Sequence, residues 1–345
     1  MLKKGSLYIS AIALLLGGCQ FNRLDHRGGY IPLDEMKGEL ATSFPTLQGA
    51  PDKAKAAHTN ISSETPKQPP TSIKNDPLDK SDSEPNDIKQ IDYFASSPED
   101  DFLARLPIRK VYRANWSGIH IGDMVLDISY SPGSKDIIIA NVHIRSRKIA
   151  HLISKYRSDN RSVFRVNDDD KLVPLTYSSA FELRSKRRDV SIIYNTDNGS
   201  VKRRASIPPE VRTKRKEVPQ ELLSNVYDPI LLGFVARDQI IKALQGNDKQ
   251  FTLPLFDGRR RSDFEFTING ITKSTRLLHI SVSEIAVAGY TNNELKKMKE
   301  RKAVIHLYLS TKDLLPVRAL GKSLVGDATA YYDHDCKTVK DCLVD

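Results

Sequence analysis

A sharp change in composition near residue 106 limits what this chain can fold into. Residues 20–106 are rich in Pro, Ser, Thr, Asp and Lys, with Pro-containing polar runs at 65–70 and 81–85. Such a segment cannot bury enough apolar surface to offset the entropy lost on ordering, so we expect a disordered tether there. Folding must then take place in residues 107–345, a length typical of one β domain.

The N-terminus carries the features of an export signal. Lys3 and Lys4 precede an apolar stretch over residues 7–16, which is too short for a spanning helix of about 20 residues. The following Leu-Gly-Gly-Cys sequence resembles a bacterial lipobox. That resemblance implies a signal peptide at 1–18, acylation of Cys19, and a lipidated N-terminus and linker at 19–106. An ordinary signal peptide that contains a cysteine is the alternative.

The residue after the cysteine bears on the location of the protein. Gln20 stands where an Asp often marks retention at the inner membrane of enteric bacteria. We therefore expect attachment to the outer membrane through the lipid anchor, facing the periplasm of a Gram-negative bacterium. Several acyl chains would hold the protein there, because each buried methylene contributes about 0.8 kcal/mol.

The two remaining cysteines, Cys336 and Cys342, lie close together near the C-terminus. If Cys19 is lipidated, this pair is left to form a disulfide, which an oxidising compartment favours. A metal site is the alternative, because His334 stands among carboxylates beside Cys336. One histidine without a second at ligand spacing is weak support for zinc, so we predict a local disulfide and neither a metal nor a cofactor.

Residues 107–345 mostly alternate between apolar and polar side chains, the pattern of β-strands. We expect strands at 111–116, 119–130, 137–144, 190–194, 200–205, 251–256, 264–268, 277–282 and 304–309. Helical spacing occurs over 149–156 and over 236–244, and Gly246 is expected to end the second helix. Asp228 before Pro229 is expected to be a helix N-cap. Many strands with few helices favour a sandwich or a sheet curled towards a barrel.

Short motifs in the same region carry a family resemblance. They are Tyr112-x-x-x-Trp116-x-Gly118-Ile119-x-x-Gly122, Pro174 before a strand pair ending near Lys202, Tyr227-Asp228-Pro229, Leu255-Phe256-Asp257-Gly258-Arg259 and Leu315-Pro316-Val317-Arg318. Together they resemble the periplasmic family catalogued as domain of unknown function 3108, over most of residues 107–330. The resemblance implies a mainly β fold, a strongly curved antiparallel sheet (spiral or open barrel-like) with one or two short helical inserts. It brings no catalytic residues. The charged segment 309–313 departs from the aromatic-rich strand end expected for the family.

The charge of the chain is divided at the same boundary as its composition. The formal net charge is +10, of which residues 20–106 contribute −5 and the signal +2, so residues 107–345 carry +13. We predict that clustered arginines bind an anionic partner. They are Arg187, Arg188, Arg203, Arg204, Arg259, Arg260 and Arg261. In the periplasm an envelope protein, a glycolipid or peptidoglycan fits such a site, whereas nucleic acid does not. The alternative is that these side chains protect exposed strand edges.

Support for catalysis is weak. Ser117, His120 and Asp123 are close in sequence, but no nucleophile elbow frames the serine, and strand residues this near cannot all converge. The acidic run 168–170 lacks the spacing of a calcium loop and is expected to be a polar turn. No phosphate-binding loop or dinucleotide fingerprint occurs. We therefore predict that the protein is not an enzyme.

These observations favour a non-enzymatic cell-envelope lipoprotein. Its curved β domain is expected to bind an envelope protein, polymer or anionic lipid and to support outer-membrane maintenance or assembly. The alternative is a periplasmic lipid-binding carrier with an apolar cavity in the β domain, because curled sheets can enclose a small ligand.

Overall fold

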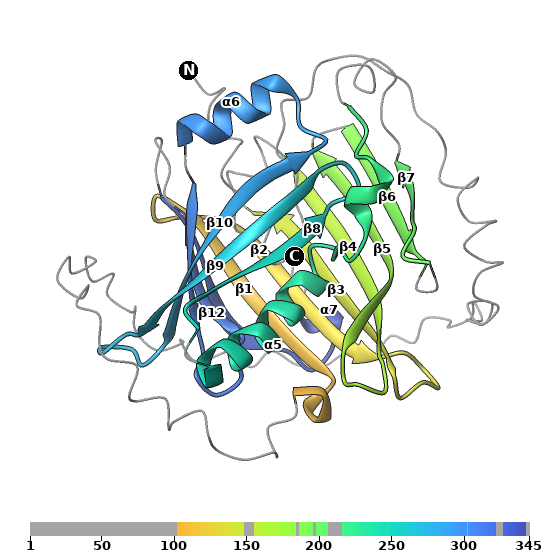
Figure 1. The fold of residues 1–345 in the computed structure, drawn as a ribbon. Helices are drawn as coiled ribbons and strands as arrows, with labels where there is room; N and C mark the ends of the chain where they lie inside the picture. The colour runs from red at the N-terminus through yellow and green to blue at the C-terminus, as the bar shows by residue number, and fades with distance from the viewer. Residues whose placement is uncertain are drawn as a thin grey trace, which may run out of the picture. The chain divides into compact units, whose positions relative to one another are not determined.

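The alternating sequence pattern forms one antiparallel sheet (Figure 1). The first strand of the chain, β1, lies in the middle of this sheet. The structure is a computed structural model and describes residues 102–147, 155–183, 186–195, 198–205, 216–246, 248–301, 303–321 and 327–342. Cys19, the signal peptide, the predicted tether up to residue 101 and most of the helix expected over 149–156 lie outside these residues. The predicted end of the tether at residue 106 is wrong, because residues 102–105 form a short 3-10 helix and Leu103 and Leu106 pack against the core. No helix in the described ranges is long and apolar enough to cross a membrane.

Thirteen strands make up the sheet in the described part of the chain, in the order β7-β6-β5-β4-β3-β2-β1-β13-β12-β11-β10-β9-β8. The strands of the first half are β1 (Ile108–Trp116), β2 (Ile119–Tyr130), β3 (Ile137–Ser146), β4 (Tyr156–Val166), β5 (Leu172–Leu183), β6 (Lys186–Tyr194) and β7 (Val201–Ala205). Those of the second half are β8 (Gln250–Phe256), β9 (Arg261–Ile271), β10 (Leu278–Ala288), β11 (Val304–Leu309), β12 (Pro316–Gly321) and β13 (Ala328–Asp335). Neighbouring strands pair antiparallel throughout.

Short helices complete the described fold. They are η3 (Phe102–Arg105), η4 (Gln220–Leu223), α5 (Leu231–Gly246), α6 (Asn292–Arg301) and α7 (Val339–Cys342). The helix predicted over 236–244 is confirmed as α5, and it ends at Gly246 as expected. The predicted helix over 149–156 is wrong at its end, because Tyr156 begins β4 and pairs with Leu183. Helix α6 was not predicted, although Thr291 and Glu294 form a capping box at its start.

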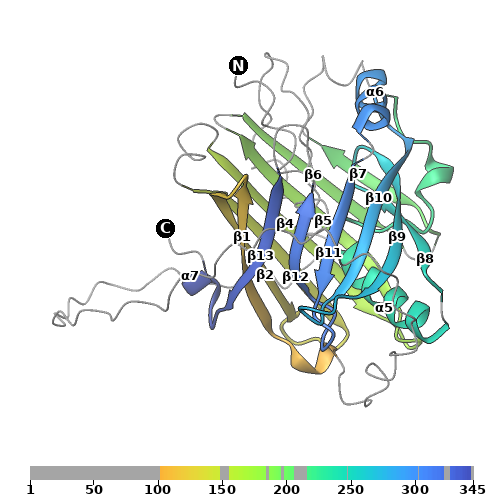
Figure 2. The same ribbon diagram turned by 90° about the vertical axis from the view of Figure 1, so that its left-hand side faces the viewer.

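Consecutive strands β7 and β8 are the two edges of the sheet, and the η4–α5 segment lies between them in the chain. Figure 2 shows the strands around β13 in front of those around β5, so the sheet curls back over itself. Helix α5 contacts β8 and β5, which belong to opposite halves. The predicted strongly curved, open barrel-like antiparallel sheet with short helical inserts is thus confirmed.

Alternate residues of each strand point into the concave side and form the core with α5. Phe164 of β4 and Phe234 of α5 pack with ring centroids 5.3 Å apart and are 1% and 8% exposed. A fully buried phenylalanine contributes about 1.5–3 kcal/mol, so this contact is a substantial part of what holds the helix to the sheet. Trp116 is partly buried against this core.

The gap between the two sheet edges, which we call the seam, is closed by side chains and by the chain before α5. A Cβ on Gly258, in the β8–β9 turn, would lie 2.3 Å from Cγ1 of Val190 on β6. Tyr227 forms a parallel bridge with Leu255 and so covers part of the edge of β8. The sheet therefore stays open in its hydrogen bonding while its two ends are packed together.

Candidate functional site

A cleft of about 1010 Å³ runs along α5 on the side of the seam. Its walls come from α5, the β4–β5 turn, the β6–β7 hairpin and the segment that leads into α5. The base of the cleft is formed by buried apolar side chains, which we call the apolar floor. They are Phe164, Val201, Leu223, Val226 and Phe234. These five side chains carry no polar atoms, so an elongated apolar group could lie on this floor.

The mouth of the cleft carries charged side chains from two elements. The β4–β5 turn supplies Asp169, Asp170 and Lys171, and α5 supplies Arg237, Asp238 and Lys242. Lys171 pairs with Asp169 at 3.2 Å, and Arg237 lies 3.6 Å from Asp238. The predicted polar turn at 168–170 is confirmed and forms part of this charged rim.

One buried carboxylate fixes the start of α5. Oδ1 of Asp228 accepts hydrogen bonds from the amides of Ile230 and Leu231, at 2.9 and 3.0 Å. Its Oδ2 accepts a bond of 2.7 Å from the hydroxyl of Ser162 on β4. Burial raises the pKa of Asp228 to about 6, although these donors oppose the shift. The predicted N-cap is confirmed, and it also ties the helix to the sheet.

Beside Asp228, the concave face of β4 carries a buried polar cluster. The amide nitrogen of Asn160 donates to Oγ of Ser158 at 3.0 Å and to the Val142 carbonyl at 3.4 Å. Its amide oxygen accepts from Ser179 at 2.7 Å and from the Tyr177 hydroxyl at 3.4 Å. Because Asn160 satisfies its donors and acceptors within the protein, the cluster is a structural network rather than a site for a ligand.

Tyr194 lies between the cleft and the seam. It lines the cleft but is only 9% exposed, and its hydroxyl makes no hydrogen bond with the described residues. Burial raises the pKa of Tyr194 well above its ordinary value, and the charges of Asp228 and Asp257 add to this effect. The phenol therefore stays neutral and contributes its ring to the cleft wall.

The β8–β9 turn is built around a second buried carboxylate. Oδ1 of Asp257 accepts from the amides of Arg259 and Arg260, at 2.8 and 2.7 Å, and Oδ2 accepts from Nε of Arg260 at 3.0 Å. Burial opposes ionisation, but the Arg260 guanidinium and these donors hold the pKa of Asp257 below its ordinary value. The guanidinium of Arg260 also lies 5.4 Å from the centroid of the Tyr290 ring.

The predicted anionic-partner site is corrected at this turn. Arg259 is 4% exposed, and the Arg260 side chain forms an ion pair with Asp257. Arg261 pairs with Asp263 at 2.6 Å and donates to the Leu222 carbonyl at 3.2 Å. The three arginines are thus directed into the protein, because the turn folds back over its own aspartate.

The remaining four arginines do not share one face of the sheet. Arg203 lies opposite Ile192, a core residue, and Arg188 lies opposite Phe181, which packs against the core. Because side chains alternate along a strand, Arg187 and Arg204 belong to the other face. Arg187 pairs there with Asp189 at 3.0 Å. Binding of an anionic partner by these residues stays a prediction, but the seven arginines are not one surface.

The residues considered for hydrolysis are also separated. Nε2 of His120 lies 2.8 Å from Oδ1 of Asp123, whose Oδ2 accepts from Nε of Arg147 at 2.6 Å. Ser117 lies in the β1–β2 turn, and no hydrogen bond joins it to His120 in the described structure. His120, Asp123 and Arg147 thus form a part-buried cluster that does not include Ser117.

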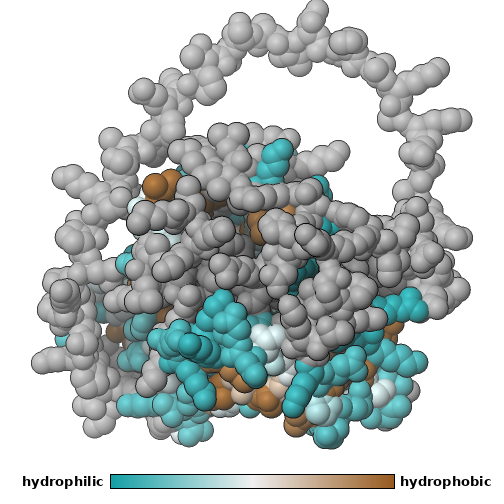
Figure 3. Space-filling view, turned by 90° about the horizontal axis from the view of Figure 1, so that it is seen from above, coloured by the Kyte–Doolittle hydropathy of each residue, from teal (hydrophilic) through white to brown (hydrophobic). Residues whose placement is uncertain are grey.

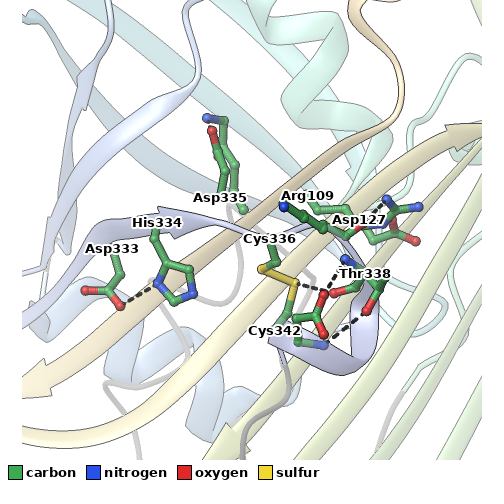
Figure 4. Close-up of a disulfide and its surroundings, with 11 residues drawn as sticks. Arg109, Asp127, Asp333, His334, Asp335, Cys336, Thr338 and Cys342 are labelled. Carbon is green, nitrogen blue, oxygen red and sulfur yellow. Dashed lines mark hydrogen bonds and ion pairs between the residues drawn. A yellow bond between two sulfur atoms is a disulfide. The ribbon is translucent and has the colours of Figure 1, made fainter. Parts of the chain in front are cut away.

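The C-terminal tail is pinned by the predicted disulfide (Figure 4). The sulfur atoms of Cys336 and Cys342 are 2.07 Å apart, and Cys342 packs on Val111 and Val125. Nearby, Nδ1 of His334 bonds to Asp333 at 2.8 Å. Within the described ranges, no group of three or more His, Cys, Asp or Glu side chains could hold a metal ion. The bond between Cys336 and Cys342 is a local covalent link within the tail.

The described surface seen from above is mainly hydrophilic, with hydrophobic residues between the hydrophilic ones (Figure 3). Such a mixed surface is normal for a folded domain and does not by itself define a binding site. The cleft beside α5 stays the main candidate because it combines a volume, an apolar floor and a charged rim.

Comparison with known proteins identifies one family. A family model described as "Protein of unknown function (DUF3108)" matches residues 111–333. No curated protein matches the chain. The crystal structure of a beta-barrel-like protein of domain of unknown function DUF1849 from Brucella abortus is similar, with 11% sequence identity and a TM-score of 0.42. That similarity covers 67% of this chain and 97% of the other.

Proposed function

We propose that this chain, which belongs to the DUF3108 family, is a non-enzymatic lipoprotein of the cell envelope that binds an amphipathic lipid in the cleft beside α5. Acylation of Cys19 would hold it on the outer membrane, and residues 107–345 would face the periplasm. Holding one lipid at a time would let the protein support maintenance or assembly of that membrane.

The cleft is the observation that carries the proposal. Its volume of about 1010 Å³ matches the upper end of the range for ligand sites, roughly 300–1,000 Å³. The apolar floor suits an acyl chain, because burying each methylene contributes about 0.8 kcal/mol. The charged rim suits a polar headgroup that remains near water. An amphipathic molecule matches both parts of the cleft, whereas a purely polar one would leave the floor uncovered.

The cleft lies beside α5 because the concave face of the curled sheet is already occupied. Core side chains and α5 occupy the concave face, including Phe164, Tyr177 and Phe234. The candidate space therefore lies along the seam and α5 rather than in the centre of the sheet. This position supports binding from the side, with the helix as one wall.

Native mass spectrometry of the full-length protein tests the proposal. The protein would be extracted from the bacterial envelope in detergent, and non-covalently bound lipid would be distinguished from the covalent anchor by its release on activation. We expect one bound phospholipid per chain. Ile241→Glu places a charge in the cleft and should remove most of this lipid.

Ile285→Glu is the matched control, because Ile285 is 48% exposed on β10 and does not line the cleft. This variant should keep its lipid. Circular dichroism would verify that both variants fold. Absence of lipid from the wild type, or equal lipid in both variants, would reject the cleft as the binding site.

A further inference from the structure

The two charged sides of the cleft rim have opposite net charges. The β4–β5 turn contributes two carboxylates, Asp169 and Asp170, against one ammonium group, that of Lys171. The side of α5 contributes two cations, Arg237 and Lys242, against the carboxylate of Asp238. The described rim as a whole is therefore neutral, with one excess negative charge on the turn and one excess positive charge on the helix.

After the ion pairs within each side are formed, one charged side chain on the turn and one on α5 have no ion-pair partner among the described residues. Lys171 is bound to Asp169, and Arg237 is the closest cation to Asp238. Asp170 and Lys242 form no ion pair with any residue in the described ranges, although Lys242 acts on Asp238 at longer range. Both side chains are exposed. Two charges of opposite sign that form no ion pair in the described structure thus line the cleft above its apolar floor.

The backbone fixes the position of the acidic member of this pair. Asp170 has a φ of 57°, and its amide donates to the Asn167 carbonyl at 3.0 Å, so its backbone is part of the hydrogen-bonded β4–β5 turn. Aspartate and asparagine tolerate this left-handed region better than most residues. The opposite member, Lys242, is held on α5, which Asp228 ties to β4. The two charges are therefore carried by well-anchored elements.

We infer that the lipid of this cleft has a zwitterionic headgroup, whose ammonium group lies by Asp170 and whose phosphate lies by Lys242. This inference rests on the proposed function, since it specifies the ligand of the same cleft. An anionic headgroup could pair with Lys242 but would meet the carboxylates of the turn. A neutral glyceride would leave both unpaired charges without a partner.

The seven arginines singled out in the sequence do not alter this balance. None of them lines the cleft in the described structure, where Arg237 is the arginine that does. The excess of positive charge on residues 107–345 is thus distributed elsewhere. Headgroup selection at the cleft depends on the local charges of the turn and α5, not on the net charge of the domain.

Titration of the full-length protein with two synthetic lipids tests the inference. Dioleoyl phosphatidylethanolamine and dioleoyl phosphatidylglycerol share their acyl chains and differ in headgroup charge. Bound lipid would be counted by native mass spectrometry in detergent. The wild type should bind the zwitterionic lipid about fivefold more tightly, the ratio that one exposed ion pair can supply.

Substitution of the two unpaired charges should change this preference in different ways. Asp170→Asn keeps the size of the side chain but removes its charge, so it should lose the fivefold preference by weakening the zwitterionic lipid and relieving the repulsion of the anionic one. Lys242→Gln should weaken both lipids. Asp168→Asn is the matched control, because Asp168 belongs to the same turn but does not line the cleft. It should behave as the wild type.

The outcomes separate this inference from the proposed function. Equal or tighter binding of the anionic lipid by the wild type, or identical behaviour of Asp170→Asn and Asp168→Asn, would overturn the zwitterionic headgroup. The cleft itself would still be supported if Ile241→Glu lost both lipids. Failure of the wild type to bind either lipid would overturn the proposed function and this inference together.

Discussion

Ser162 on β4 donates a hydrogen bond of 2.7 Å to Oδ2 of Asp228, whose other carboxylate oxygen caps α5. Both residues are fully buried. Through this bond, a strand from the first half of the sheet fixes the helix that precedes the second half. The wall of the cleft therefore depends on one carboxylate that the solvent does not reach.

Removal of that carboxylate should destabilise the fold. Asp228→Ala deletes the N-cap and leaves Ser162 without its acceptor, so we expect the free energy of unfolding to fall by about 2 kcal/mol. Urea denaturation at pH 7 would measure this change. Asp168→Ala, on the exposed β4–β5 turn, is the control and should alter the free energy of unfolding little. Equal stability of the two variants would contradict the role given to Asp228.

Titration of Asp228 should also make the free energy of unfolding depend on pH. Burial raises the pKa of Asp228 to about 6, above its value in the unfolded chain. The folded state then binds this proton more tightly, so the contribution of Asp228 to stability increases as the pH falls through 6 and is lost as the pH rises. Relative to Asp228→Asn, the wild type should gain about 1 kcal/mol between pH 7 and pH 5. Parallel pH profiles of the two proteins would show that Asp228 does not titrate in this range.

Closure of the seam can be tested at Gly258. Its φ is +84°, and an added methyl group would lie 2.3 Å from Val190, so Gly258→Ala should combine backbone strain with a clash. Gly133→Ala is a matched control, because Gly133 has a φ of +78° and no atom within 4 Å of the added Cβ. We expect the Gly258 variant to lose at least about 1 kcal/mol more unfolding free energy than the control. Equal losses would mean that the two sheet ends are not tightly packed there.

Attachment to the membrane can be tested at Cys19, which lies outside the described residues. The wild type should incorporate labelled palmitate and fractionate with the outer membrane. Cys19→Ser should lose the label, whereas Cys336→Ser should retain it, because that thiol belongs to the disulfide. Labelling that survives Cys19→Ser would contradict lipidation at this position.

Local signals in the sequence predicted nine of the thirteen described strands, whereas β4, β5, β12 and β13 were not assigned as separate strands. The alternation over 119–130 is realised as β2 (Ile119–Tyr130), and the strand predicted over 251–256 begins one residue earlier as β8 (Gln250–Phe256). Asp228 before Pro229 was enough to predict the helix cap. These features depend on neighbouring residues, and therefore a single sequence contains them.

The site could not be predicted in the same way. The bond from Ser162 to Asp228 joins residues 66 positions apart, and the cleft is lined by residues from Leu103 to Gln245. The face that an arginine of β6 or β7 occupies depends on strand register, which a cluster of basic residues does not reveal. Arg260 is paired with Asp257 because the β8–β9 turn folds over this carboxylate, which a run of three arginines does not reveal.

Photo-crosslinking of an acyl lipid tests the central claim most directly. Full-length protein in detergent would be loaded with dioleoyl phosphatidylethanolamine that carries a diazirine in one acyl chain, then irradiated and mapped by peptide mass spectrometry. The account predicts cross-links on the apolar floor, at residues such as Phe234 and Val201, and their loss in Ile241→Glu. Cross-links confined to exposed positions such as Ile285, unchanged in that variant, would contradict it.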